Sequence, residues 1–293
     1  MNSKSYVLIT PARDEGQYIE RTLVSVCNQS LLPLRWVIVN DGSTDETEKI
    51  VSSYLQGHSF IRLINSTRDG QRNFGSKVKA FKEGYRLVAD LEYEYIGNLD
   101  ADISFGTDYF KDLLGEFEKE QLLGLAGGIV QENINGKYFA QKTSLNSVCG
   151  STQIFRRKCY ESIGGYIPIK VGGIDTAAEI LARANGWIVK TFPEYKVFAH
   201  RRVGTGIGRH ILKTKFNQGI SNYLLGYHPL FQVISSLSRM GESPILFGSV
   251  FMITGYFWAF LKKSKKLLPI DTQQYLRSEQ INGLKVALLQ RNK

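Results

Sequence analysis

Short apolar runs alternate with helical stripes along the first hundred residues of the chain. The runs at 6–10, 36–40, 60–64 and 95–99 are mainly apolar and have the length of strands, and the run at 95–99 is typical of a short buried strand. Between them, apolar residues recur three or four positions apart, most regularly from Phe74 to Val88. Because strands that alternate with helices form βαβ units, this pattern predicts an α/β fold with a mostly parallel central sheet flanked by helices.

Two local signals set the expected boundaries of these elements. Pro11 is expected to end the first strand, because proline lacks the N–H that a sheet uses. After the second strand, Gly42 permits a tight turn. Ser43 and Glu46 then have the spacing of a capping box that opens the next helix.

The alternation continues beyond residue 105. It predicts two further helices, at 109–117 and 175–184, and three further strands, at 123–130, 187–192 and 196–199. We expect an α/β domain over 1–205, with halves 1–105 and 106–205, followed by a helical region over 206–293.

The positive charge of the chain is concentrated in one stretch. The formal net charge is +10, and residues 195–270 hold eleven Lys or Arg against one acid, Glu242. The remaining residues hold 26 charges of each sign and are neutral overall. Such a basic stretch predicts an anionic partner, which is nucleic acid, anionic lipid or a phosphorylated substrate.

Cysteine use and missing motifs narrow the class of protein. Cys27, Cys149 and Cys159 have no metal-ligand spacing and indicate a reducing compartment. The first residues lead into a strand without an apolar leader, so we expect no secretory signal. No Gly-x-Gly-x-x-Gly follows the first strand, and no P-loop motif occurs, which argues against a classical dinucleotide fold and a P-loop enzyme.

Asp100-Ala101-Asp102 lies where the fourth apolar run ends, and open α/β sheets bind ligands at such strand ends. Two carboxylates separated by one small residue can hold a divalent cation. Their hard oxygens suit Mg²⁺ or Mn²⁺, which also bind substrate phosphates. An isolated Asp-x-Asp is more often a solvated turn, so the other motifs must decide between these interpretations.

Four polar motifs stand in order at the predicted carboxyl edge of the sheet: Thr10–Glu15, Asn40–Asp45, Arg72–Gly75 and Asn98–Asp102. In this order and at these spacings they resemble the motifs of the inverting family 2 glycosyltransferases, which have the GT-A fold. The resemblance covers residues 5–205. It implies a nucleotide-sugar donor, a divalent metal and transfer with inversion at the anomeric carbon.

The resemblance also implies which residues meet the nucleoside. Pro11, Ala12, Arg13 and Glu15 belong to the segment that would border it. Asp41 would accept a hydrogen bond from the base, with uracil favoured and guanosine or thymidine nucleotides left open.

The resemblance also implies which residues bind the metal and the diphosphate. Asp102 would ligate the Mg²⁺ or Mn²⁺ that bridges the diphosphate, and Asp100, across Ala101, would help to hold ribose or metal. Arg72 would approach the diphosphate or the sugar. A metal at this position neutralises the negative charge that grows on the leaving phosphate.

The acceptor hydroxyl needs a general base on the opposite face of the sugar. The resemblance favours Asp175, at the start of a predicted helix. The family usually has Glu-Asp there, and Ile174 replaces the Glu, which leaves Glu179 as a rival. The alternative is that Asp175 only caps its helix, as aspartate often does.

Basic and metal-binding side chains follow the last predicted strand. The resemblance makes His200 a candidate to complete the metal shell, and a structural histidine is the alternative. Arg201 and Arg202 are candidates for contact with the diphosphate, because guanidinium pairs with phosphate in bidentate fashion. Their alternative is a solvated basic edge.

The run 245–261 contains no Asp, Glu, Lys or Arg and is followed by a lysine cluster at 262–266. This composition suits three alternatives: a short membrane span, a helix that lies in the membrane interface, or a hydrophobic helix packed on the core. The adjacent charge favours an anionic cytoplasmic leaflet, so we expect a cytoplasmic protein that is peripheral on the inner face of the plasma membrane. Residues 271–293 are expected to form an exposed polar helix.

The long spans and the Gln-x-x-Arg-Trp motif of processive synthases are absent, so one sugar per encounter is expected, on a glycan or lipid-linked acceptor. Two other functions compete with this interpretation. A sugar-phosphate nucleotidyltransferase would need a Gly-rich loop after the first strand, where no glycine occurs before Gly16. A non-enzymatic nucleic-acid binder would explain the charge, but the basic stretch has no recognised nucleic-acid motif, and no nucleic-acid partner is expected.

Overall fold

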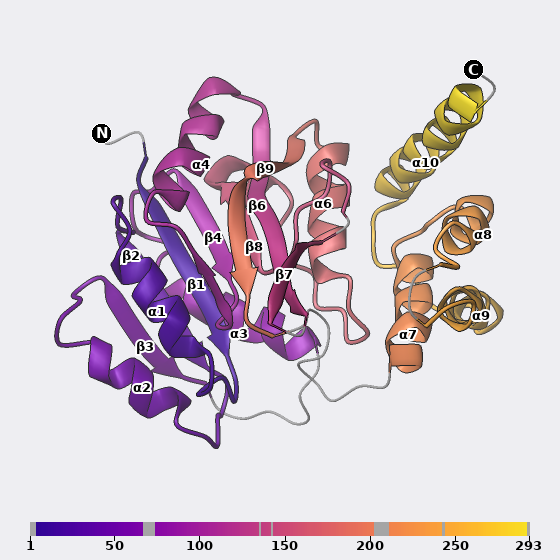
Figure 1. The fold of residues 1–293 in the computed structure, drawn as a ribbon. Helices are drawn as coiled ribbons and strands as arrows, with labels where there is room; N and C mark the ends of the chain where they lie inside the picture. The colour runs from indigo at the N-terminus through magenta and orange to yellow at the C-terminus, as the bar shows by residue number, and fades with distance from the viewer. Residues whose placement is uncertain are drawn as a thin grey trace.

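The computed structural model describes residues 4–66, 74–134, 136–141, 143–201, 211–241 and 244–291. In this part of the chain, the strands are β1 (Tyr6–Ala12), β2 (Arg35–Asn40), β3 (Ile61–Asn65), β4 (Tyr95–Leu99), β5 (Ile103–Phe105), β6 (Leu123–Ile134), β7 (Lys137–Ala140), β8 (Thr152–Arg156) and β9 (Ile188–Ala199). They form one mixed sheet in the order β3-β2-β1-β4-β8-β6-β9-β5, and β7 pairs with β6 at its side (Figure 1).

Helices cover both faces of this sheet and extend beyond it. They are α1 (Ile19–Cys27), α2 (Thr47–Tyr54), α3 (Phe74–Arg86), α4 (Tyr109–Lys119), α5 (Arg157–Ser162), α6 (Ile174–Ala184), α7 (Ile211–Leu224), α8 (Pro229–Leu237), α9 (Phe247–Leu261) and α10 (Ile270–Arg291). Figure 1 shows α7 to α10 gathered beside α6, at one side of the sheet.

The parallel part of the sheet agrees with the sequence prediction. β1 pairs in parallel with both β2 and β4, and β2 pairs in parallel with β3. β8 then runs antiparallel to β4 and β6, while β6 and β9 are parallel. The two predicted halves of the α/β domain therefore share one sheet, and β1, β2 and β4 end at the same edge.

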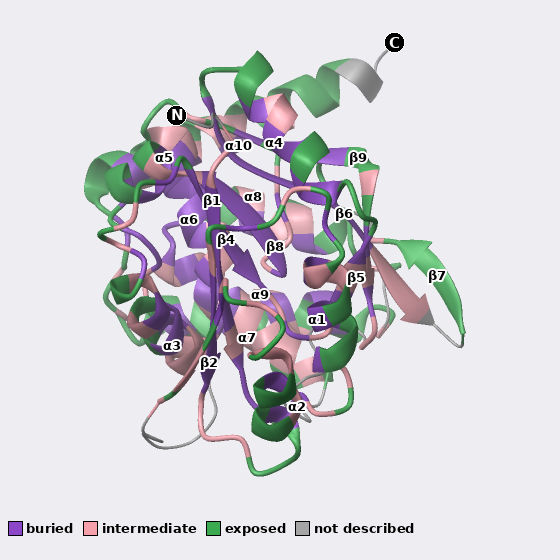
Figure 2. Ribbon diagram, turned by 90° about the vertical axis from the view of Figure 1, so that its left-hand side faces the viewer, coloured by how far each residue is buried: buried purple, intermediate pink, exposed green. Residues whose placement is uncertain are grey.

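Two hydrophobic cores lie on opposite faces of the sheet, because successive side chains of a strand point to opposite faces. Along β1, Tyr6 and Leu8 pack in the core that includes α1 and α4, and Val7 and Ile9 pack in the core that includes α3 and α6. Figure 2 shows the central strands as buried, whereas β7 is exposed.

Two expected strand boundaries are wrong. Pro11 does not end β1, which continues to Ala12. The pairing of β1 with β4 extends only to Ile9, so Pro11 lies beyond the part of the strand that is paired on both sides. The strands expected at 187–192 and 196–199 are one strand, β9, which crosses a register shift against β6.

The expected capping box is also absent, because its serine has another partner. Ser43 Oγ accepts a hydrogen bond from the backbone N–H of Asp14, at 3.0 Å, and so joins two loops. Helix α2 begins at Thr47, whose N–H donates to Asp45 Oδ1 at 3.0 Å, and Glu46 makes no side-chain cap.

The C-terminal helices pack through close backbone contact. Gly219 of α7 and Gly255 of α9 lie at the crossing of these two helices, where a Cβ on either glycine would meet the other helix's backbone at 2.0 Å. The predicted polar tail helix corresponds to α10. The run expected at 245–261 contains α9, which has 15 residues. Among the described residues, no helix combines the length and apolar character that crossing a membrane requires.

Candidate active site

A cavity of about 900 Å³ opens at the edge where β1, β2 and β4 end. The structure brings together residues that the sequence holds in separate motifs, and those that line this cavity are Pro11, Ala12, Arg13, Glu15, Asp41, Asp100, Ala101, Asp102, Asp175 and Arg201. The motifs that follow β1, β2 and β4 lie close together because these parallel strands end at the same edge of the sheet. Arg72 and Arg202 lie outside the described residues.

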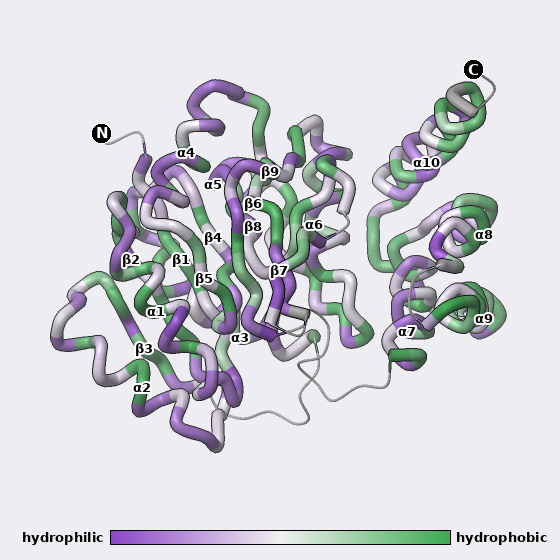
Figure 3. Tube along the Cα trace, in the orientation of Figure 1, coloured by the Kyte–Doolittle hydropathy of each residue, from purple (hydrophilic) through white to green (hydrophobic). Residues whose placement is uncertain are grey.

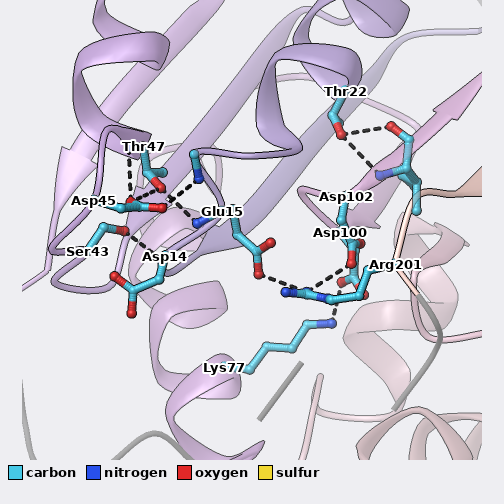
Figure 4. A network of polar contacts seen from close by, with 12 residues as sticks. Asp14, Glu15, Thr22, Ser43, Asp45, Thr47, Lys77, Asp100, Asp102 and Arg201 are labelled. Carbon is cyan, nitrogen blue, oxygen red and sulfur yellow. Dashed lines mark hydrogen bonds and ion pairs between the residues drawn. The ribbon is translucent and has the colours of Figure 1, made fainter. Parts of the chain in front are cut away.

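Carboxylates and cations alternate at the centre of the cavity. Arg201 Nη2 lies 2.9 Å from Glu15 Oε1 and 2.8 Å from Asp102 Oδ2. Lys77 Nζ, from the first turns of α3, lies 2.5 Å from Asp100 Oδ1. Figure 4 shows the two basic side chains reaching the aspartates from different elements. Each carboxylate of the Asp-x-Asp motif therefore has a cation of the protein beside it.

The cluster shifts the titration of its members. The pKa of Asp102 is raised to about 6, first by burial and then by the charge of Asp100, against the opposing effect of Arg201. Burial lowers the pKa of Lys77, but the charges of Asp100, Asp175 and Asp102 outweigh burial and raise it above the ordinary lysine value. The negative field of these carboxylates thus favours bound cations.

Arg13 and Asp41 form a second pair at the ends of β1 and β2. Arg13 Nη1 lies 3.5 Å from Asp41 Oδ2, and both side chains are largely buried. Burial raises the pKa of Asp41, although Arg13 opposes the shift. The Arg13 Nε atom is buried and has no hydrogen-bond partner among the residues that the structure describes.

The aspartates offer a donor set that fits Mg²⁺ or Mn²⁺. Asp100 and Asp102 supply hard carboxylate oxygens, which these ions prefer. Among the described residues, no group of three or more His, Cys, Asp or Glu is arranged to hold a metal. A cation here therefore needs further ligands from a bound substrate, and carboxylates combined with substrate phosphates are a common Mg²⁺ set.

His200, which the resemblance makes a candidate metal ligand, does not line the cavity in this structure. Its Nε2 lies 2.9 Å from Ser104 Oγ, and its Nδ1 lies 3.0 Å from Arg21 Nη1 and 3.2 Å from the Tyr138 hydroxyl. Because side chains alternate in extended chain, Arg201 faces the cavity and His200 does not. Burial and then Arg21 lower the pKa of His200. Through these contacts the imidazole connects the end of β9 with β5, α1 and β7.

Asp175 lies in the first turn of α6 and faces the cavity. It does not cap the helix, since the N-cap residue is Gly173 and no side-chain cap is formed. The backbone at Gly150 packs against its carboxylate, because a Cβ there would lie 2.9 Å from Asp175 Oδ2. This carboxylate therefore lies against the backbone of Gly150 on the cavity wall.

Glu179, the rival to Asp175, follows one helical turn later and is buried. Its Oε1 accepts hydrogen bonds from the Val148 N–H at 2.9 Å and from Ser147 Oγ at 3.2 Å. Burial, followed by the charge of Asp175, raises the pKa of Glu179 to about 8. At neutral pH this carboxyl holds a proton and anchors the loop before β8.

Comparison with known proteins identifies the family. The model of the family described as Glycosyl transferase family 2 matches residues 7–174, which is more than half of the chain. The chain belongs to glycosyltransferase family 2. The protein is thus a transferase enzyme, and the nucleotidyltransferase and nucleic-acid-binder interpretations are set aside.

The relatives of this glycosyltransferase are similar over part of their length. A glycosyltransferase of Mycoplasma genitalium is 32% identical over 130 residues, which are 44% of this chain and 41% of the relative. The chondroitin synthase of Pasteurella multocida is 30% identical over 113 residues, which are 39% of this chain and 11% of the relative. The chain therefore spans less than half of the length of these relatives.

Solved structures show that the glycosyltransferase has the GT-A fold. S. aureus TarS in complex with UDP-GlcNAc aligns with a TM-score of 0.55 and 16% identity, over 88% of this chain and 73% of that one. The mannosyltransferase PcManGT of Pyrobaculum calidifontis, in complex with GDP-Man and Mn²⁺, aligns with a TM-score of 0.57 and 14% identity. The alignment covers 97% of this chain and 80% of that one.

Sequence analysis missed one side chain at the centre of the glycosyltransferase's cavity. Lys77 stands one position before Val78, a member of the helical stripe that predicted α3. The helix follows β3, so its first turns start at the edge where the motifs meet. A lysine in these turns is the signal that points to the site.

Proposed function

We propose that the enzyme transfers one sugar from a nucleotide-sugar, with a UDP-sugar favoured, to a hydroxyl of a glycan or lipid-linked acceptor, with inversion at the anomeric carbon. The observation that carries the proposal is the single cavity that contains Asp41, the Asp100–Asp102 pair and Asp175. The donors bound by the structural neighbours, UDP-GlcNAc and GDP-Man, support a nucleotide-sugar as substrate class.

In this proposal the ends of β1 and β2 hold the nucleoside. Pro11 and Ala12 offer a wall of the cavity, and Asp41 accepts a hydrogen bond from the base. The pair between Arg13 and Asp41 supports this role, because the arginine fixes the carboxylate before the base arrives. Glu15 is bound to Arg201 and so connects the nucleoside end of the site to the diphosphate end.

The diphosphate lies beside the alternating cluster. Asp100 and Asp102 would hold Mg²⁺ or Mn²⁺, which supplies neutralisation of the charge on the leaving phosphate. Lys77 and Arg201 already lie against these aspartates, and both can donate to phosphate oxygens. The Ala101 methyl group, between the aspartates, leaves room for the donor.

The transfer step exchanges one bond at the anomeric carbon for another. The acceptor oxygen forms a bond to that carbon while the bond to the phosphate oxygen breaks, and the electron pair leaves with the nucleoside diphosphate. Asp175 takes the acceptor proton as the general base. Glu179 is unsuited to this role, because it holds its own proton at neutral pH and its Oε1 already accepts two hydrogen bonds.

The donor site is tested by thermal shift with UDP, GDP and dTDP, with and without Mn²⁺. We expect one nucleotide to stabilise the wild type in a metal-dependent manner, and Asp102→Ala to lose the effect. Asp112→Ala, an exposed aspartate on α4, is the matched control and keeps the shift. The absence of a shift with every nucleotide would contradict the proposal.

Asp175 is tested separately from the donor site. We expect Asp175→Asn to lower the transfer rate by about 10²–10⁴, the usual contribution of a general base, with the nucleotide shift unchanged. Transfer that survives this change at the wild-type rate would assign the base elsewhere.

We further propose that the helical region 206–293 docks on an anionic membrane surface. An apolar patch on α9 supports this: its members Phe247, Val250, Trp258 and Leu261 are 52–75% exposed. Figure 3 shows α8 and α9 as the hydrophobic helices of the region. The lysines at 262–266 follow directly, and each basic residue near an anionic leaflet contributes about 1 kcal/mol.

The membrane proposal is tested by co-sedimentation with phosphatidylcholine vesicles, with and without phosphatidylglycerol. Trp258→Asp is expected to release the protein from the anionic vesicles. Phe139→Asp on β7 is the control, because Phe139 and Trp258 are both 52% exposed. Equal binding of the two variants, or no dependence on the anionic lipid, would refute docking through this patch.

A further inference from the structure

The cavity extends past the donor residues onto the C-terminal helices. Thr214, Gln218 and Asn222 follow each other at intervals of four along α7, and all three line the cavity. Residues spaced by four lie on one face of a helix, so α7 presents a polar stripe to this space. The aromatic rings of Tyr227 and Phe231 line the same end and lie 6.0 Å apart.

Helix α7 is fixed directly on the turn that precedes Asp175. Ser221 Oγ, which is buried, donates to the carbonyl oxygen of Gly172 at 2.8 Å. Gly173 has φ +90°, and a Cβ on it would lie 2.2 Å from the same hydroxyl. Leu225 then packs in the core that contains α6. The polar stripe of α7 therefore begins beside the general base that we propose.

A buried network positions one member of the stripe. Asn222 Nδ2 donates to Gln232 Oε1 at 2.8 Å, and Gln232 Nε2 donates to Ser236 Oγ at 3.0 Å. Both Gln232 and Ser236 are fully buried, so their only evident use is to hold Asn222 at the cavity wall. The described part of the chain gives the side chains of Thr214 and Gln218 no hydrogen-bond partner.

This wall has the chemistry of a sugar site. Its amides and hydroxyl match the hydroxyl groups of a sugar as donors and acceptors. Its aromatic rings offer apolar faces of the kind that line ligand pockets. The wall lies beside Asp175 and away from the residues assigned to the nucleoside, so a ligand here would lie on the acceptor side.

One cation stands at the end of the wall. Arg239 follows α8 by two residues and lines the cavity. The nearby Arg183 is paired with Glu279, at 2.9 Å, whereas the described residues supply no ion-pair or hydrogen-bond partner to the Arg239 guanidinium. A guanidinium that faces a sugar site suits a carboxylate or a phosphate on the ligand.

We propose that α7 and the end of α8 form the acceptor subsite, and that its ligand is a sugar that carries a carboxylate or phosphate group paired with Arg239. This inference rests on the proposed transferase function, and it names the class of acceptor. Thr214, Gln218 and Asn222 bind the sugar hydroxyls, and Tyr227 and Phe231 contact its apolar face.

The experiment uses the full chain saturated with Mg²⁺ and the nucleotide that stabilises it, so that the donor site is filled. Saturation-transfer NMR then measures the binding of three probes: methyl glucoside, methyl glucuronide and glucose 6-phosphate. We expect the wild type to bind at least one charged probe about fivefold more tightly than the neutral one, the factor for an exposed ion pair. The better charged probe distinguishes carboxylate from phosphate.

Two variants and two controls separate the contributions. Gln218→Ala is expected to weaken all three probes about fivefold, the loss of one hydrogen bond. Arg239→Gln is expected to remove only the preference for charge. Asn217→Ala, the neighbour on α7 that does not line the cavity, and Lys285→Gln, an exposed lysine on α10, leave binding unchanged.

This experiment gives different results when the transferase proposal fails and when only the acceptor subsite fails. A chain that no nucleotide stabilises would overturn the transferase proposal and this inference with it. Nucleotide-bound protein that binds no probe at about 10 mM, or whose binding is unaffected by Gln218→Ala, would overturn the subsite alone. Unchanged preference for charge in Arg239→Gln would overturn the anionic acceptor.

Discussion

Replacement of Gly219 by alanine is expected to destabilise the protein, although alanine is the better helix former. A Cβ at position 219 would lie 2.0 Å from the carbonyl oxygen of Met252 and 2.7 Å from the backbone nitrogen of Tyr256. Backbone atoms cannot rotate away as a side chain can, so α7 and α9 must move apart. Overpacking of this kind costs about 1–3 kcal/mol and outweighs a helix-propensity gain of about 1 kcal/mol.

The matched control is Gly283→Ala in α10, where a Cβ meets nothing within 4 Å. The same substitution is expected to increase the free energy of unfolding by about 1 kcal/mol there. Urea unfolding followed by circular dichroism measures both. Gly219→Ala with the stability of the wild type or above would refute the close contact of the two helices.

A double variant tests whether the crossing is one shared contact. In the same way, a Cβ on Gly255 would lie 2.0 Å from the carbonyl oxygen of Phe216. Once one alanine has separated the helices, the second finds more space, so the loss in the double variant should be smaller than the sum of the single losses. Additive losses would mean that the two glycines act independently.

Three further predictions concern the site. Glu179→Gln should flatten the pH dependence of stability, because the pKa of Glu179 is about 8 in the folded chain and the wild type therefore loses stability as pH rises from the ordinary glutamate pKa to 8. Urea unfolding between about pH 5 and 8 checks this, and a variant with the same slope as the wild type would contradict it. His200→Gln should leave the Mn²⁺ affinity of the nucleotide-bound protein unchanged in calorimetry, since the imidazole contacts other side chains, and weaker binding would make His200 a metal ligand. Gly150→Ala should lower the transfer rate and keep the nucleotide-induced thermal shift, because its Cβ would displace the Asp175 carboxylate; an unchanged rate would remove Asp175 from catalysis.

Strands β1, β2 and β4 could be predicted from sequence because each is a mainly apolar run that is buried along almost its whole length. Strand β3 could be predicted from its apolar residues although Arg62 interrupts them and is exposed. The polar motifs that follow β1, β2 and β4 then had to meet at one edge, which is why Arg13, Asp41 and Asp100 line one cavity. Strand β8 is short and pairs with β4 across more than fifty residues of chain, so no local pattern indicates its position.

Side-chain direction was harder to predict than position. His200 and Arg201 are adjacent, and which of them faces the cavity depends on the register of β9, which shifts against β6 between Gly128 and Ile129. The pairing of Lys77 with Asp100 joins residues 23 positions apart. Helix α7 lies in the region predicted to be helical, but its place at the cavity was not predicted, because Thr214, Gln218 and Asn222 show no motif in the sequence that connects them to the site.

The alternation of charges at the site also explains how it can be stable without a donor. Three carboxylates, those of Glu15, Asp100 and Asp102, lie against two cations, Lys77 and Arg201, so each of these charges has a partner of opposite sign without a donor. Unpaired charges in a partly buried site would be costly, and paired charges are far less so. Under the proposed function, a diphosphate would offer its oxygens to Lys77 and Arg201, and Asp100 and Asp102 would then be left to hold the metal. Each charge would exchange one partner for another, which would keep the electrostatic cost of donor binding small and would favour a ligand that brings both an anion and a cation.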